Sequence, residues 1–192
     1  MQGGDPVYAY KPNLAGASWV FCLTSKGIEW EYGRRSGVVR YGQVTRVRMS
    51  FRPATLQGYR FLTEIWSPDN PKLQISSASF RGMMELSRQD KEYNPFITEL
   101  HRRLAAAGST ARFETGMHAW LYWIGAAVMT AIGVTLLVFL ARVLMTGDLK
   151  GAAVVVGIMA LFVWQVGTLF VRNRPRTYRP DEPPPVVMPR VR

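Results

Sequence analysis

The sequence predicts an α+β membrane protein: a β-rich N-terminal domain that ends in a helix, followed by two transmembrane helices in a hairpin. Two observations predict this class. Charged residues are scattered through the chain up to about Met117, whereas two long stretches beyond it contain none. The first part instead shows short runs that alternate between apolar and polar residues, a pattern typical of strands. A chain of 192 residues has room for one such domain and a smaller element.

The two uncharged stretches are residues 119–141 and 151–171. About 20 helical residues cross a hydrocarbon core of about 30 Å, so each stretch is long enough to span a membrane. Aromatic residues gather at the start of the first stretch, where they favour the headgroup region. Residues 142–150 are too few for a domain, so we expect a short extracytoplasmic loop and two antiparallel helices.

Basic residues indicate the orientation of this hairpin. Arginines are frequent before residue 119 and after residue 171, whereas the loop holds only Arg142 and Lys150. Basic residues near a membrane favour the cytoplasmic side. The first residues also lack the apolar core of a signal peptide. We therefore expect both chain ends in the cytoplasm.

Small and polar residues inside the spans indicate helix contacts. Ala127 with Ala131, and Ala153 with Gly157, have the four-residue spacing that lets helices approach closely. Gln165 is expected to form a hydrogen bond between helices. Two interpretations stay open, namely packing within the hairpin and contact between copies of the chain.

The soluble domain is expected over residues 18–108, after an N-terminal segment of residues 1–17. A helical period begins near residue 90 and Gly108 fits a helix end, which predicts a terminal helix over residues 90–107. Residues 109–118 would link this domain to the membrane. The expected strands are residues 18–24, 27–32, 38–41, 44–51, 59–66 and 72–76.

Three segments carry a resemblance to a known family: residues 27–33 (GIEWEYG), 37–49 (GVVRYGQVTRVRM) and 73–77 (LQISS). With the terminal helix, they resemble the bacterial pleckstrin-homology-like (PH-like) domains of small membrane proteins, over roughly residues 8–108. The resemblance implies a β-barrel or curved sheet of about seven strands capped by one helix. It also implies a bacterial inner-membrane location and binding of lipids or proteins rather than catalysis. A lipocalin-like or other β-barrel is the alternative fold.

The segment 44–52 predicts a basic surface, because its apolar and basic side chains alternate. If neighbouring strands pair, their arginines form one patch that would bind anionic lipid headgroups or an acidic protein. The alternative is a solvated basic face. No nucleic-acid-binding fold is recognisable. The arginines expected in the patch are Arg34, Arg35, Arg40, Arg46, Arg48, Arg52 and Arg60.

The sequence offers little for catalysis. A single cysteine, Cys22, cannot form an internal disulfide, and only His101 and His118 could join it in a metal site. Glu29 and Glu31 alternate on one strand face, but paired acids in an active site need a cleft and a cause for shifted pKa values, and a solvated strand face explains them at least as well. We expect no enzyme, no metal and no cofactor.

The tail, residues 172–192, is rich in proline and arginine, so it favours an extended conformation. It is expected to be either a peptide ligand, for a partner or for this domain, or a disordered basic segment. The leading hypothesis is a non-enzymatic membrane-anchored PH-like module with a structural or assembly role. Two alternatives remain: an accessory subunit of a larger membrane complex that binds through the hairpin, and a transporter or enzyme component of unrecognised chemistry.

Overall fold

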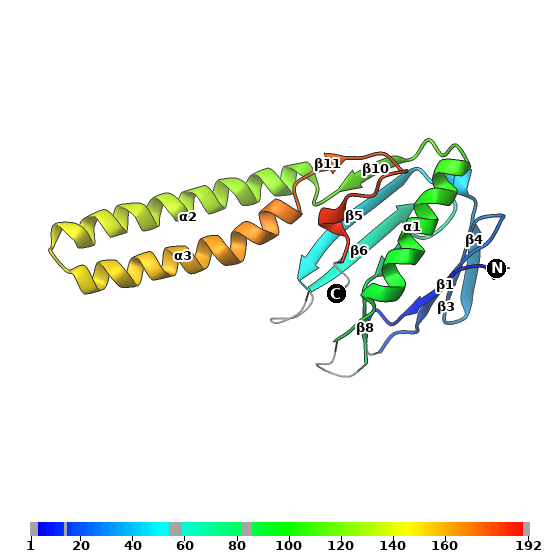
Figure 1. Ribbon diagram of the computed structural model, residues 1–192, viewed down its shortest axis with the longest axis horizontal. Coiled ribbons are helices and arrows are strands. Elements are labelled where there is room, and N and C mark those ends of the chain that lie inside the picture. The colour runs from blue at the N-terminus through cyan, green and yellow to red at the C-terminus, as the bar shows by residue number, and fades with distance from the viewer. Residues whose placement is uncertain (1–3, 14, 54–58, 82–85, 190–192) are drawn as a thin grey trace. The chain divides into compact units, whose positions relative to one another are not determined.

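The computed structural model describes residues 4–13, 15–53, 59–81 and 86–189. The chain forms two compact units. The α+β unit contains residues 1–116 and 176–192, and the helical unit contains residues 117–175. The helical unit is therefore an insertion, because the chain leaves the α+β unit and later returns to it (Figure 1).

A four-stranded antiparallel sheet begins the α+β unit, with its strands paired in chain order. Aromatic and aliphatic side chains alternate with exposed ones, so one sheet face enters the core. Phe21, Leu23 and Ile28 are completely buried on this face. The strands are β1 (Val7–Tyr10), β2 (Trp19–Leu23), β3 (Ile28–Tyr32) and β4 (Arg35–Val39).

The second sheet has five strands in the order β11-β10-β5-β6-β7. β10 pairs parallel with β5, and β11 pairs antiparallel with β10. A short 3-10 helix, η1 (Tyr41–Gln43), connects the first sheet to the second, and β8 (Ala78–Phe80) pairs with β9 (Leu86–Arg88). The five strands are β5 (Arg46–Pro53), β6 (Tyr59–Trp66), β7 (Leu73–Ser76), β10 (Arg112–Thr115) and β11 (Arg176–Thr177).

The helix α1 (Asp90–Ala106) covers the core. Its buried residues recur every three or four positions and form one stripe. Within the core the hydroxyl groups of Thr63 and Tyr93 are 2.7 Å apart and share a hydrogen bond. Gly108, just after the helix, adopts a left-handed φ of 61°. This conformation is unfavourable for residues that have a Cβ atom. The stripe consists of Tyr93, Phe96, Ile97, Leu100, His101 and Leu104.

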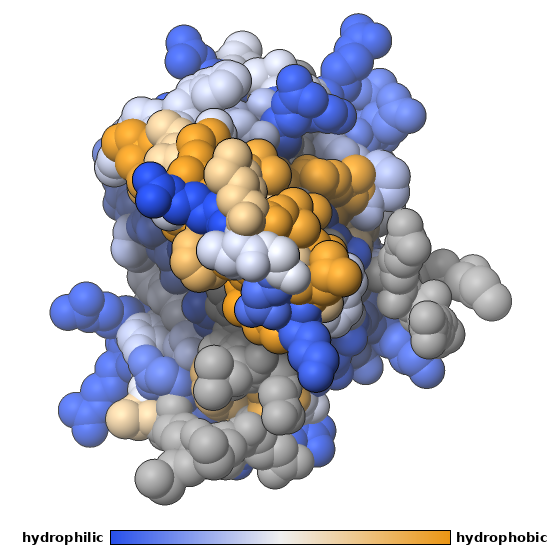
Figure 2. Space-filling view, turned by 90° about the vertical axis from the view of Figure 1, so that its left-hand side faces the viewer, coloured by the Kyte–Doolittle hydropathy of each residue, from blue (hydrophilic) through white to orange (hydrophobic). Residues whose placement is uncertain are grey.

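The helical unit consists of α2 (Ala119–Met145) and α3 (Leu149–Arg172), which pack side by side (Figure 1). Among the described residues, α2 alone is long and apolar enough to cross a membrane, and its apolar part is exposed to the outside. The apolar stretch described in α3, Leu149–Trp164, is shorter. Hydrophobic residues gather on the surface of this unit (Figure 2). One candidate span is therefore shown, and the expected second span is not.

The α+β class is confirmed, but the expected single barrel or curved sheet of about seven strands is not. The described residues form eleven strands in several sheets without a closed barrel. β1 lies in the expected N-terminal segment, and β10 lies in the expected linker. Both strands are short, with four residues each, so their local pattern is weak. Their pairing with β2 and β5 stabilises them instead.

The small residues Ala127, Ala131, Ala153 and Gly157 do not pack the two helices together. All four are exposed. A Cβ atom built on Gly157 would meet nothing within 4 Å. The less exposed positions of α2 and α3 recur on other sides of the helices, because a period of 3.6 residues places only one stripe toward the neighbour. These four residues are thus exposed in the described hairpin, while the side chain of Gln165 lies outside the described part.

Candidate functional site

The structure divides the seven expected arginines between two sheets. Arg34 and Arg35 lie at the turn between β3 and β4, and Arg40 follows β4. The other four lie on β5 and β6, which pair with each other. β4 and β5 belong to different sheets, so strand pairing does not join the two groups into one patch. The 3-10 helix η1 separates β4 from β5. The sequence did not predict this break between the two sheets.

The first two arginines of β5 are paired with a carboxylate. An Arg48 Nη atom donates to Glu114 Oε2 at 2.8 Å, and Arg46 Nε lies 3.8 Å from Glu114 Oε1. The register places Glu114 of β10 beside Arg48. Only 4% of Arg48 is exposed, so this guanidinium is a buried charge with a partner. Glu114 was missed because its segment was expected to be a linker.

A second carboxylate, Glu64, lies on the same face of the sheet. It is 2% exposed and accepts hydrogen bonds from Arg52 at 3.1 Å, Lys72 at 2.9 Å and Gln74 at 3.2 Å. The ring of Trp66 lies within 5.7 Å of the cationic groups of Arg46, Arg48 and Lys72, which is cation–π geometry. Much of the basic charge on β5 is therefore compensated within the protein.

Arg60 lies directly opposite Arg52 in the β5–β6 register. Its Nε atom is buried and has no hydrogen-bond acceptor in the described part of the chain. Like charges in opposite positions repel. Arg60 thus retains a positive charge that no described hydrogen bond at Nε offsets.

Arg34, Arg35 and Arg40 are different because all three are exposed. None forms an ion pair with a described residue. Gly33, with a φ of 63°, permits the tight turn that carries Arg34. Arg35 and Arg40 stand at opposite ends of β4, about 17 Å apart along the strand. Among the seven arginines expected in the patch, these three are the most available to an external anion.

The outer face of the four-stranded sheet is acidic instead. Glu29 and Glu31 project there and line a shallow depression of about 300 Å³ together with Val20, Cys22 and Val38. Burial, reinforced by Asp5 and Glu29, raises the pKa of the Cys22 thiol. The thiol therefore favours its protonated form, which is a poor nucleophile.

His101 is buried and connects α1 to the tail. Its Nδ1 atom lies 2.8 Å from the Ile97 carbonyl oxygen, and its Nε2 atom lies 2.8 Å from the Tyr178 hydroxyl. A carbonyl only accepts, so Nδ1–H donates to it and Nε2 accepts from Tyr178. Burial lowers the pKa of His101, which favours this neutral form. No group of three or more His, Cys, Asp or Glu side chains suited to a metal occurs in the described chain.

Residues 176–189 of the tail lie along the α+β unit. The Tyr178 amide donates to the Phe113 carbonyl oxygen at 3.1 Å, and the Tyr178 ring packs against Phe113 and His101. Farther on, the 3-10 helix η2 (Pro185–Val187) contacts β5, and Val187 is 1% exposed. The described part of the tail therefore contacts its own α+β unit.

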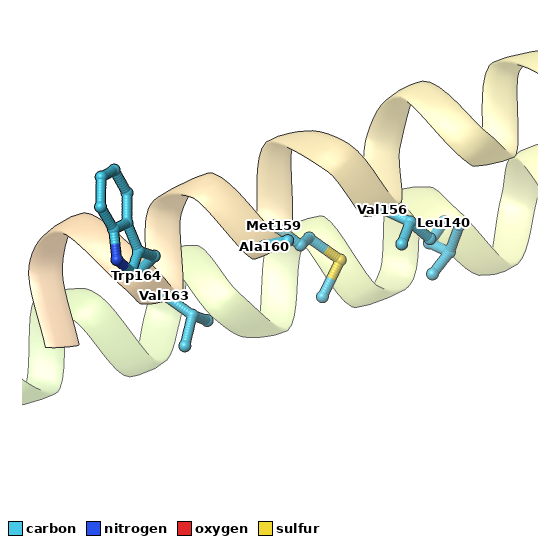
Figure 3. Close-up of a pocket in the computed structure, with 6 residues that line it drawn as sticks. All are labelled: Leu140, Val156, Met159, Ala160, Val163 and Trp164. Carbon is cyan, nitrogen blue, oxygen red and sulfur yellow. The ribbon is translucent and has the colours of Figure 1, made fainter.

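The helical unit has an apolar groove of about 500 Å³ (Figure 3). Most of its lining comes from α3, and the side chain of Trp164 is 71% exposed. The lining residues are Leu140, Val156, Met159, Ala160, Val163 and Trp164.

Comparison of the chain with protein-family models, with curated proteins and with solved structures found no match. The assignment of function therefore depends on the residues and geometry described above.

Proposed function

We propose that this protein is a non-enzymatic, membrane-anchored PH-like module that engages anionic phosphate groups at the cytoplasmic face of a bacterial inner membrane. Its role is structural: it holds or organises other components at that surface. The exposed arginines Arg34, Arg35 and Arg40, without carboxylate partners among the described residues, carry the proposal.

The helical unit supports membrane anchoring. α2 exposes large apolar side chains along its length, among them Leu137, Val138 and Phe139 at 55% each. In the proposal α3 is the second span, because residues 151–171 carry no charge. Only residues 116–118 and 173–175 separate the helices from β10 and β11. Such short connections would keep the α+β unit close to the lipid headgroups.

The arginines supply the chemistry for phosphate. A guanidinium group presents planar paired donors that match phosphate oxygens. A basic residue near an anionic leaflet contributes about 1 kcal/mol. The chain as a whole has a net charge of +11, so long-range attraction acts in the same direction.

The order of elements supports the PH-like resemblance. A four-stranded antiparallel meander is followed by the antiparallel strands β5, β6 and β7 and then by α1 over the core. β10 and β11 extend this plan at one sheet edge.

The test uses the full chain in nanodiscs of phosphatidylcholine, with or without phosphatidylglycerol. Hydrogen exchange at residues 33–40 should slow in the anionic discs, and salt should reverse the effect. A variant with Arg34→Ala and Arg35→Ala should lose the protection. Arg102→Ala is the matched control, because Arg102 is also exposed but paired with Glu99. Equal exchange in both kinds of disc at low salt would rule out lipid phosphate as the ligand.

The groove on α3 favours a second candidate, an accessory subunit that binds a larger membrane complex through its helices. Trp164 would enter a partner helix interface, since large exposed aromatic residues often anchor interfaces. Purification in mild detergent should then yield a partner in fixed stoichiometry, and Trp164→Ala should release it. A chain that purifies alone from its native membrane would speak against this candidate.

A further inference from the structure

We infer that the surface of α1 and β5 that the C-terminal tail covers is a recognition site for a proline-rich segment of a partner protein, and that the tail is its exchangeable occupant. The relevant tail residues run from η2 to Pro189 and come from the far end of the chain. Figure 1 shows this end, drawn in red, beside β5 and α1. The inference does not depend on the arginines of the proposed function.

Two contacts hold this part of the tail. Val187 is 1% exposed and forms the apolar anchor. Asn94 of α1 donates from Nδ2 to the Pro189 carbonyl oxygen at 2.8 Å, and Pro189 is itself buried. Proteins commonly bind peptides in this way, with a pocket for an apolar side chain and hydrogen bonds to the peptide backbone.

The amide contact is incomplete. Asn94 Oδ1 is buried, yet it has no hydrogen-bond donor in the described part of the chain. In an extended segment the N–H and C=O groups of one residue point the same way, so a side-chain amide can bond to both. Proline has no N–H group. Pro189 therefore accepts a hydrogen bond from Asn94 Nδ2 but cannot donate one to Asn94 Oδ1.

The fit beside this contact is also loose. A hollow of about 290 Å³ remains along the tail. It is open to solvent, and five of its six lining residues belong to the tail. A segment with a different residue in place of Pro189 would supply the missing donor. The hollow is lined by Asn94, Pro183, Pro185, Val186, Met188 and Pro189.

The tail thus has the properties of a built-in but suboptimal ligand. Because it is tethered, its effective concentration is about millimolar, which favours it over a free peptide of equal affinity. A partner that presents the same backbone shape with a non-proline residue opposite Asn94 would compete. The partner is therefore a protein with an accessible segment of the type Pro-Pro-aliphatic-aliphatic.

The experiment begins with the full chain in mild detergent and a protease site inserted between Asp181 and Glu182, which are both exposed. After cleavage, the end of the tail is held only by its contacts, and near-ultraviolet circular dichroism checks that the fold is retained. The probe is a fluorescent peptide of residues 182–192, followed by anisotropy. The peptide should bind the cleaved chain, fail to bind the uncleaved chain, and lose binding with Val187→Asp.

The decisive comparison uses a Pro189→Ala peptide. It supplies the missing N–H and should bind about three- to tenfold more tightly than the native peptide. On the Asn94→Ala chain this gain should disappear, which separates the hydrogen bond from the greater flexibility of alanine. Absence of exchange over a day, or an equal effect of Pro189→Ala on both chains, would overturn the inference.

Discussion

Replacing Glu114 with glutamine tests whether the β5 face is a structural ion network. Glu114→Gln removes the negative charge beside Arg48, whose side chain is only 5% exposed. A buried cation that loses its partner typically costs about 3–5 kcal/mol. Glutamine retains one acceptor, so we expect the lower end, about 3 kcal/mol. For a unit of this size that lowers the unfolding midpoint by about 10 °C.

The matched control is Glu64→Gln. Its cationic partners, Arg52 and Lys72, have side chains 45% and 41% exposed, so water can solvate them after the change. We therefore expect a smaller loss of about 1–2 kcal/mol, although Glu64 is the more buried carboxylate. Adding Arg48→Met to Glu114→Gln should recover about half of the larger loss, because the buried charge is gone.

The assay is thermal unfolding of the full chain in detergent, with near-ultraviolet circular dichroism to follow the aromatic side chains of the α+β unit. The decisive quantity is the order of the two losses. If Glu64→Gln destabilises the unit more than Glu114→Gln, the exposure of the partner cation does not control the cost. If Arg48→Met fails to recover stability, the buried charge is not its cause.

Three further predictions follow from the fold and the buried polar groups. Replacement of residues 117–175 by an Asn-Gly turn should yield a soluble, folded α+β unit, because Thr115 and Arg176 are antiparallel partners; aggregation with loss of near-ultraviolet signal would contradict it. Burial lowers the folded-state pKa of His101 from its ordinary 6.5, so the folded state binds fewer protons. Stability should therefore be complete above about pH 6.5 and decline as the pH falls below it, measured as the unfolding midpoint from pH 8 to 5, while His101→Gln should be flatter over that range. Gly37→Ala should cost about 1–3 kcal/mol in chemical denaturation, because its Cβ atom would lie 2.8 Å from the Trp30 ring; an unchanged midpoint would show that the ring moves aside freely.

Local patterns predicted the elements with strong periodicity. The helix expected over residues 90–107 matches α1, because its apolar residues recur every three or four positions and Gly108 ends it. β5 and β6 were likewise expected, since each has eight residues and a clear alternation. The weak elements were missed: β1 and β10 have four residues each, and β11 has two. Such strands depend on partners that are distant in the chain.

The candidate site shows the same division. The alternation of Arg46, Arg48 and Arg52 with apolar residues was visible in the sequence. Their partners Glu114 and Glu64 were not, because a carboxylate becomes a partner only when strand register brings it across. The proline-rich composition of the tail indicated a possible peptide ligand. No sequence pattern indicated that Asn94, His101 and Tyr178 take part in its contacts.

The sequence by itself determined the α+β class, the apolar character of residues 119–141 and the positions of the arginines, because these depend on residue type and short-range period. The tertiary structure decided which arginines keep their charge available and which are neutralised. It also decided that Ala127, Ala131, Ala153 and Gly157 are exposed, and that the tail returns to contact α1 and β5. Each of these depends on contacts between segments far apart in the chain, and no local pattern specifies them.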